Sequence, residues 1–218
     1  MKKIAIFGAG GFGREVKTII DAINIRTPKT FEFIGFFDDN IAKHEVINGF
    51  PVLGGIAELN QFKEELNVAV SIADPLIKKN IINSIKPKNI YYPNLIHPSV
   101  LISDESVEIG IGNIICAQTI LTCNIKIGDF IILNLMCTVG HDTTIQSYSS
   151  FMPSVNISGE VMVGEGVYVG TGAKIINQLE IGEFTTVGAG AVVAKSLPAF
   201  CTAVGIPAKP IKFHNHLQ

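Results

Sequence analysis

An apolar residue recurs at every sixth position in the second half of the chain. The run begins at Ile109 and ends at Val193, and all 15 of its positions are apolar. Because only 47% of the chain is hydrophobic, chance would very rarely produce an unbroken run of this length. A glycine directly follows seven of the 15 positions. A six-residue period is typical of parallel β-helices, in which each hexad is one short strand and one corner.

This period predicts a solenoid with three internal ladders. With three hexads per coil, residues eighteen apart lie one above the other on strands about 4.8 Å apart. The run then makes about five coils, and one extra residue before Ile109 offsets an earlier turn. Each inward side chain would contribute about 1.5 to 3 kcal/mol through burial. The predicted ladders are Ile109, Ile127, Ile145, Val163 and Ile181; then Ile115, Leu133, Phe151, Val169 and Val187; then Leu121, Val139, Ile157, Ile175 and Val193.

The first half of the chain has a different pattern. The apolar run "IAIF" stops at the glycines of "GAGGFGREV", and residues with helical spacing follow. Later apolar runs continue this alternation of strand and helix until about residue 95. We therefore predict two domains. Residues 1–94 form an α/β unit with an open parallel sheet of three or four strands, and residues 95–218 form the β-helix with a C-terminal tail.

Composition limits the partners and the compartment. The 17 basic and 19 acidic residues give a net charge of -2, without the basic footprint of a nucleic-acid-binding protein. The four cysteines lack paired spacing, which favours reduced packing thiols and a cytoplasmic protein. The apolar run at the N-terminus reaches glycine too soon for a signal peptide or a membrane span. We expect a soluble protein with a small-molecule partner.

His141 and Asp142 are the candidate chemical groups of the solenoid. His141 stands two residues after the inward Val139, so its ring should point outward. A carboxylate beside an imidazole favours the protonated ring and strengthens it as a base. Gly159 lies one coil further on and leaves space for a ligand, and its N–H could stabilise an oxyanion. From the residues alone, two solvated corner residues remain an equally good interpretation.

Two other interpretations of this region are weaker. A cysteine nucleophile at Cys123 or Cys137 competes with an equally good packing role for both thiols. A metal site is not expected, because adjacent strand residues project differently and no second histidine lies at ligand spacing. The remaining histidines are interpreted as exposed residues: His44, His97, His214 and His216.

The glycines after the first strand suggest a phosphate-binding loop. Gly8, Gly10 and Gly13 have the spacing of a dinucleotide fingerprint, which by itself is weak evidence. The next acidic residues, Asp38 and Asp39, come later than the fingerprint requires, and the unit is too small for a complete NAD fold. Asp74 could line the same cleft, but a turn role before the following proline is at least as good an explanation.

The hexads, together with "GAGGFGREV", "FDDN", "GHD" and "VGIPAKPIK", resemble the hexapeptide-repeat acyltransferases. More narrowly, the chain resembles the sugar acetyltransferases of bacterial pilin glycosylation, perosamine and sialic acid pathways. The resemblance covers nearly the whole chain. It implies a Rossmann-like N-terminal domain, a left-handed β-helix, a homotrimer, and acetyl-CoA in the groove between neighbouring β-helices.

The resemblance also implies roles for individual residues. His141 acts as the base, Asp142 orients it, and the Gly159 amide stabilises the intermediate. Several relatives carry histidine where this chain has Phe12, which leaves the substrate open. The implied substrate contacts are Gly10, Gly11 and Phe12 near the sugar and phosphates, Asp38 and Asp39 near the nucleoside, and Gly55 in the same cleft. The implied acetyl-CoA contacts are Ser150, Gly159, Thr171, Ala189 and Lys209. For Lys209, an exposed lysine without a ligand is an equally good interpretation.

The leading hypothesis is therefore an acetyl-CoA-dependent acetyltransferase of bacterial glycan biosynthesis. It would act on an amino or hydroxyl group of a nucleotide-linked sugar and need no metal. Alternatives are O-acetylation of a free sugar such as sialic acid, transfer of another acyl group such as succinyl, and a non-catalytic sensor of sugar nucleotides. The sequence leaves open whether the nucleotide carries uracil or guanine and whether nitrogen or oxygen is acetylated.

Overall fold

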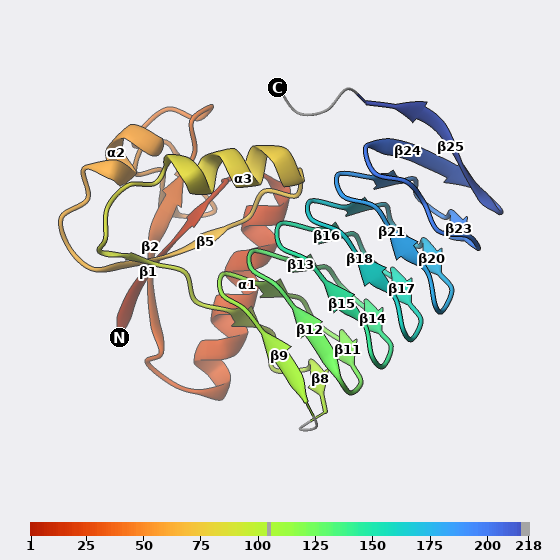
Figure 1. Ribbon diagram of the computed structural model, residues 1–218. Helices are drawn as coiled ribbons and strands as arrows, with labels where there is room; N and C mark the ends of the chain where they lie inside the picture. The colour runs from red at the N-terminus through yellow and green to blue at the C-terminus, as the bar shows by residue number, and fades with distance from the viewer. Residues whose placement is uncertain (104–105, 215–218) are drawn as a thin grey trace.

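The computed structural model describes residues 1–103 and 106–214. Figure 1 shows two units side by side: an N-terminal sheet with helices, and a solenoid whose coils run on to the C-terminal strands. None of the helices in this described part of the chain is long and apolar enough to cross a bilayer.

The N-terminal unit is an open parallel sheet of four strands, which confirms the predicted α/β sheet. Its strand order is β2-β1-β5-β6. The central strand β1 has all four residues of its "IAIF" run buried, as expected for a parallel strand covered on both faces. The elements of this unit are β1 Lys2–Phe7, α1 Gly11–Arg26, β2 Phe31–Phe37, β3 Val46–Ile47, β4 Phe50–Pro51, α2 Ile56–Asn60, β5 Leu66–Val70, α3 Pro75–Ser84 and β6 Ile90–Tyr91.

The solenoid has three faces, here named sheets I, II and III. Sheet I contains β7 Leu95–Ile96, β10 Ile114–Ile115, β13 Ile132–Leu133, β16 Ser150–Phe151, β19 Tyr168–Val169, β22 Thr186–Val187, β24 Cys201–Gly205 and β25 Ala208–Phe213. Sheet II contains β8 Leu101–Ile102, β11 Ile120–Leu121, β14 Thr138–Val139, β17 Asn156–Ile157, β20 Lys174–Ile175 and β23 Val192–Val193. Sheet III contains β9 Val107–Ile109, β12 Ile125–Ile127, β15 Thr144–Ile145, β18 Met162–Val163 and β21 Glu180–Ile181.

The strand register confirms the predicted repeat. Ile127 pairs with Ile145, eighteen residues on, whereas Ile96 pairs with Ile115 across nineteen. The extra residue of the first coil therefore lies before Ile109, as the sequence predicts. All ladder positions from Ile115 to Val193 are buried, and Ile109 in the first coil is partly buried against the same core. Each coil is thus covered by its neighbours, and an end coil is covered on one side.

The N-terminal unit packs against sheet I of the solenoid. A single apolar cluster joins Ile6 and Ile20 of the N-terminal unit to Leu95, Ile114 and Ile132 of sheet I. This cluster continues the N-terminal core across the junction. The two units are therefore packed together through a shared core.

Two lysines of α3 bridge this junction. Lys78 is 1% exposed, and its Nζ donates a hydrogen bond to Ser150 Oγ at 2.8 Å. Burial lowers the pKa of Lys78 to about 7. Lys79 forms an ion pair with Glu165 and lies 5.6 Å from the ring centre of Tyr148. Because α3 covers sheet I, the corner between sheets II and III is the edge of the solenoid opposite the N-terminal unit.

Candidate active site

His141 lies on this opposite edge, in the corner that joins β14 to β15. The coils on both sides fix the corner backbone: the Asp142 N–H donates to the Cys123 carbonyl at 3.1 Å, and the His141 carbonyl accepts from the Glu160 N–H at 2.8 Å. The side chain of His141 is 56% exposed. The structure thus turns the ring outward, so that a ligand on the edge can reach it.

The imidazole and Asp142 are joined by a hydrogen bond. His141 Nδ1 and Asp142 Oδ2 are 2.7 Å apart. Asn124 Nδ2 donates to the second oxygen, Oδ1, at 3.0 Å. These bonds, the one to His141 first, hold the pKa of the Asp142 carboxyl below its usual value. An ionised carboxylate at Nδ1 keeps the proton of the neutral ring on that nitrogen and leaves Nε2 free to accept another.

The ring of His141 lies against the backbone of Gly159. A Cβ added at Gly159 would lie 2.5 Å from both Cε1 and Nε2 of the ring, so any larger residue would displace it. Within residues 1–103 and 106–214, no group accepts a hydrogen bond from the Gly159 N–H. This arrangement leaves a backbone donor near the imidazole, as stabilisation of an oxyanion would require.

Two of the cysteines, Cys116 and Cys137, lack the properties of a nucleophile. Burial raises the pKa of Cys137 to about 12, and the Cys137 thiol donates to the Met152 carbonyl at 3.4 Å. Cys116 is buried and has a similarly raised pKa of about 12. Cys123 is half-buried, and all four cysteines are free thiols. Since the thiolate is the reactive form, the buried thiols are poor candidates for carrying an acyl group.

The described residues hold no group of three potential metal ligands. His97 Nδ1 is paired with the Ser99 hydroxyl at 2.8 Å, and His214 Nε2 is paired with the Thr202 hydroxyl at 2.8 Å. His44 is exposed, and His216 lies outside the described residues.

The glycine loop lies between the carboxyl end of β1 and the start of α1. A Cβ on Gly13 would lie 1.9 Å from the Gly8 carbonyl oxygen, so glycine is required for the close approach of helix and strand. In contrast, nothing lies within 4 Å of a Cβ added at Gly10. Phe12 packs partly buried against the N-terminal core. The loop therefore offers open backbone at Gly10 and Gly11, and little side-chain chemistry.

The acidic turn after β2 lies beside this loop. Asp38 Oδ2 accepts from the Ala9 N–H at 2.9 Å, and Asp39 Oδ1 accepts from the Ile56 N–H at 2.8 Å. Gly55 lies against Asp39, because a Cβ there would be 2.2 Å from Asp39 Oδ1. The structure thus brings the predicted sugar-nucleotide residues together at the carboxyl ends of β1 and β2, where open α/β sheets commonly bind ligands.

Asp74 is a helix cap and not part of this cluster. Its Oδ1 accepts a hydrogen bond from the Ile77 N–H at 2.9 Å, at the start of α3. The turn interpretation of this residue is the one that its hydrogen bond supports.

Comparison with known proteins covers both units. Residues 3–85 match the family model of the PglD N-terminal domain. The chain is 33% identical to GDP-perosamine N-acetyltransferase of Escherichia coli O157:H7, over 97% of each chain. The chain belongs to the family of hexapeptide-repeat sugar acetyltransferases.

Among solved structures, PerB from Caulobacter crescentus with CoA and GDP-perosamine is 29% identical, with a TM-score of 0.87 over 97% of this chain and 98% of that one. The acetyltransferase domain of PglB from Neisseria gonorrhoeae FA1090 is 30% identical, with a TM-score of 0.87 over 97% of this chain and 100% of that one.

These matches establish the left-handed sense of the β-helix and the class of the enzyme. The chain is an acyltransferase, and acetyl-CoA is its co-substrate.

Of the residues besides Gly159 that are expected to contact acetyl-CoA, three are exposed on the solenoid and one is buried. Thr171 and Ala189 are exposed on the corner between sheets I and II, one coil apart, and Lys209 is exposed on β25. Ser150 differs from them, because it is fully buried beneath α3 and its hydroxyl accepts from Lys78. The packing of α3 on sheet I thus separates Ser150 from any surface that acetyl-CoA could reach.

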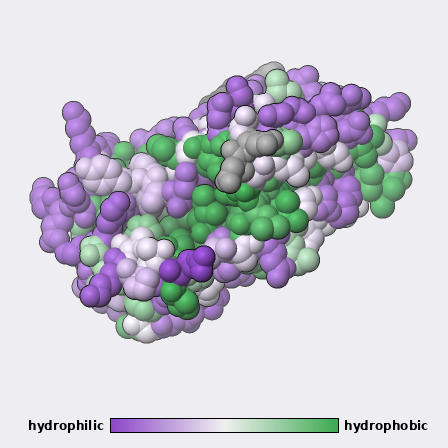
Figure 2. Space-filling model, turned by 90° about the horizontal axis from the view of Figure 1, so that it is seen from below, coloured by the Kyte–Doolittle hydropathy of each residue, from purple (hydrophilic) through white to green (hydrophobic). Residues whose placement is uncertain are grey.

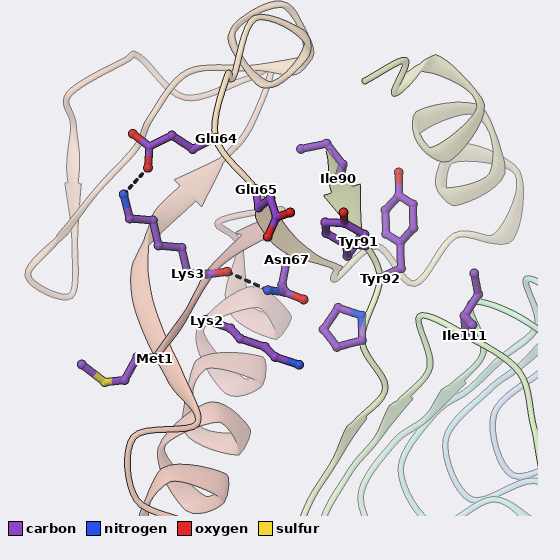
Figure 3. A pocket seen from close by; sticks show the side chains of 11 residues that line it. Met1, Lys2, Lys3, Glu64, Glu65, Asn67, Ile90, Tyr91, Tyr92 and Ile111 are labelled. Carbon is purple, nitrogen blue, oxygen red and sulfur yellow. Dashed lines mark hydrogen bonds and ion pairs between the residues drawn. The ribbon is translucent and has the colours of Figure 1, made fainter. Parts of the chain in front are cut away.

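A cavity of about 830 Å³ opens at the other edge of the N-terminal sheet. Figure 3 shows Lys2, Tyr91 and Tyr92 around it, with the Lys3–Glu64 ion pair on one side. None of the site residues predicted from the sequence lines this cavity. Its lining mixes both charges with aromatic rings and contains no arrangement suited to acyl transfer.

Sequence reasoning missed two polar residues that matter to the architecture. Asn124 contacts Asp142 from the preceding coil, and its eighteen-residue spacing was the available signal. Lys78 had no such signal, because its burial depends on how the two units pack together.

Proposed function

We propose that this acetyltransferase moves the acetyl group of acetyl-CoA to an amino group of a nucleotide-linked sugar. The His141–Asp142 pair lies beside the Gly159 N–H, for which no described residue is an acceptor, and this observation carries the proposal. The relatives named for GDP-perosamine support an amino group as the acceptor. Phe12 leaves the sugar itself open, and GDP-linked amino sugars are the first acceptors to test.

The mechanism is direct transfer. The amine nitrogen attacks the carbonyl carbon of the thioester while His141 Nε2 takes a proton from the amine. Asp142 stabilises the imidazolium that forms, and the Gly159 N–H donates to the oxyanion of the tetrahedral intermediate. The intermediate then collapses, the C–S bond breaks, and the CoA thiolate leaves with the proton held by His141. The products are the N-acetylated sugar nucleotide and free CoA.

The N-terminal unit would hold the sugar nucleotide. In our proposal, Gly10, Gly11 and Phe12 contact the sugar and phosphates, with the first N–H groups of α1 facing the negative charge. The other substrate contacts are Asp38 and Asp39 at the nucleoside and Gly55 in the same hollow, whose volume is about 270 Å³. Among the described residues, Asp39 accepts a side-chain hydrogen bond through Oδ1 alone, which leaves Oδ2 available to a ribose hydroxyl.

A homotrimer would bring the two parts of the reaction together. Within one chain, His141 lies on the edge opposite sheet I, and sheet I carries the N-terminal unit. The two sites can therefore meet only if a second copy presents its glycine loop at this edge. Leu101 and Ile120 are exposed and adjacent on sheet II, and Figure 2 shows a broad apolar area on the face seen from below. Burial of such an area between copies is favourable.

Acetyl-CoA would lie in the groove between neighbouring solenoids of the trimer. Gly159, Thr171, Ala189 and Lys209 are the residues we place along it, and Ser150 is left out because it is buried. The free thiols of all four cysteines fit a reducing compartment, so we place the enzyme in the cytoplasm.

The proposal is tested by measuring free thiol as CoA is released. The protein is incubated with acetyl-CoA and, separately, GDP-linked amino sugars, UDP-linked amino sugars and free sialic acid. We expect release with a nucleotide-linked amino sugar and none from the His141→Ala variant. Release with sialic acid alone would favour O-acetylation of a free sugar. No release with any acceptor would favour a sensor of sugar nucleotides and contradict the proposal.

A further inference from the structure

Four polar residues form a row along the edge that carries His141. Asn124, Asp142, Glu160 and Gln178 occupy the same corner position in four successive coils. Their φ values are 55°, 58°, 58° and 61°, so the backbone is nearly identical at each position. Because the strands that lead into these corners pair in register, the four side chains lie one above the next.

The row contains two carboxylates in the middle and one amide at each end. Asn124 Nδ2 donates to Asp142 Oδ1 at 3.0 Å. Gln178 Nε2 donates to Glu160 Oε2 at 3.2 Å in the same manner. Of these four residues, only Asp142 is hydrogen-bonded to the His141 ring, through its other oxygen, Oδ2. Each amide therefore restrains one carboxylate, but only one of the two restraints is connected to the base.

We infer that Asn124 is a positioning residue for the transfer reaction, acting on His141 through Asp142. The terminal torsion of an aspartate side chain has broad, soft minima, so a second contact is needed to fix the carboxylate plane. Asn124 supplies that contact and holds Oδ2 on Nδ1 of the ring. It also stabilises the charge of Asp142 next to Glu160, one coil away, where two carboxylates repel each other.

A neutral donor suits this position. A lysine or arginine at residue 124 would partly neutralise the negative charge of Asp142. The imidazolium formed during transfer needs that charge for its own stabilisation. The Asn124 amide donates without adding a formal charge, so Asp142 keeps its electrostatic attraction for the protonated ring. The consequence is a chain of two hydrogen bonds, from Asn124 to Asp142 and from Asp142 to His141, that spans two coils and is here called the relay.

The experiment compares Asn124→Ala with the matched control Gln178→Ala. Both variants remove an amide that donates to a carboxylate of the row, but Gln178 acts on Glu160, whose carboxylate is not hydrogen-bonded to the ring. We expect Asn124→Ala to lower kcat about 10-fold, the effect of losing one hydrogen bond to a charged group, with KM for acetyl-CoA within about twofold. Gln178→Ala should keep both values.

A spectroscopic measurement tests the relay without turnover. The 15N shifts of the His141 imidazole report which nitrogen carries the proton in the neutral ring. Asn124→Ala should increase the fraction with the proton on Nε2, and Gln178→Ala should not. Asn124→Asp keeps the shape of the residue but removes the donor and adds a like charge, so it should lower kcat more than Asn124→Ala does.

The inference rests on the proposed function for its kinetic part, and the two fail separately. Unchanged kcat and unchanged 15N shifts in both Asn124 variants would overturn the inference while leaving the function intact. Equal losses in Asn124→Ala and Gln178→Ala would also overturn it, because a general effect on the edge would explain both. If the wild-type protein transfers no acetyl group, the function fails, and the 15N comparison alone then decides whether Asn124 positions the ring.

Discussion

The edge of the solenoid and the edge of the N-terminal sheet use polar groups in opposite ways. At the solenoid edge, Asp142 and His141 direct their polar atoms at each other, and both remain open to solvent. At the sheet edge, Asp38 and Asp39 accept hydrogen bonds from the backbone of neighbouring loops. The first arrangement provides a base, and the second provides a shaped surface. In the proposed function, the solenoid therefore carries the chemistry and the N-terminal unit carries recognition.

The largest expected effect follows from removing the base. His141→Ala should lower kcat about 1,000-fold, within the range for loss of a general base. Because the side chain is 56% exposed, the thermal unfolding midpoint should stay within a few degrees. Titration calorimetry should show unchanged affinity for the sugar nucleotide. Weakened binding of the sugar nucleotide would show that the two functions are not separated between the units.

A methyl group beneath the ring should disturb the chemistry without disturbing the fold. In Gly159→Ala the new Cβ would lie 2.5 Å from the imidazole and push the ring off its position. We expect kcat to fall about 100-fold, as when an oxyanion donor or its alignment is lost. The φ of Gly159 is outside the left-handed region, so the solenoid should fold normally. The control is Ser158→Ala, which adds no atom near the ring and should keep its activity.

A glycine-to-alanine substitution in the glycine loop should lower stability and sugar-nucleotide binding, where Gly159→Ala lowers kcat and leaves the fold intact. In Gly13→Ala the new Cβ would lie 1.9 Å from the Gly8 carbonyl oxygen and force α1 away from β1. We expect a loss of about 2 kcal/mol of unfolding free energy, typical of overpacking, together with weaker sugar-nucleotide binding. Denaturant unfolding measures the first and calorimetry the second. Gly10→Ala is the stability control, since nothing lies within 4 Å of its Cβ.

The last effect, the smallest when taken per pH unit, concerns the lysine between the two units. The pKa of Lys78 falls from 10.5 to about 7 on folding, so between these values the unfolded chain binds more protons. Stability should therefore rise with pH across this window, by at most about 1.4 kcal/mol per pH unit from this residue. Lys78→Met should remove that part of the slope in unfolding measured from pH 7 to 10. The matched control Lys79→Met should retain it, and a slope unchanged by Lys78→Met would contradict the assignment.

Much of the solenoid could be predicted from the sequence, but the packing between the two units could not. The six-residue period predicted the three ladders, the register and the outward position of His141, because in a periodic fold spacing alone determines which residues are neighbours. It could not predict that Ser150 is buried, since the outer face of sheet I looks like the other faces until α3 covers it. The burial of Lys78 has the same origin. In the N-terminal unit, the glycines predicted an open loop, but the partners of Asp38 and Asp39 depend on loop packing that has no period.

The proposed meeting of the two units between copies can be measured by complementation. The first variant, His141→Ala, keeps the glycine loop. The second, Gly10→Trp, fills that loop where nothing lies within 4 Å of the new Cβ and keeps His141. Each variant should be inactive alone. Co-expressed with different tags and purified through both, mixed trimers should recover about one third of wild-type activity, because one of their three interfaces joins an intact loop to an intact base. Mixed assemblies no more active than their parents would contradict the account.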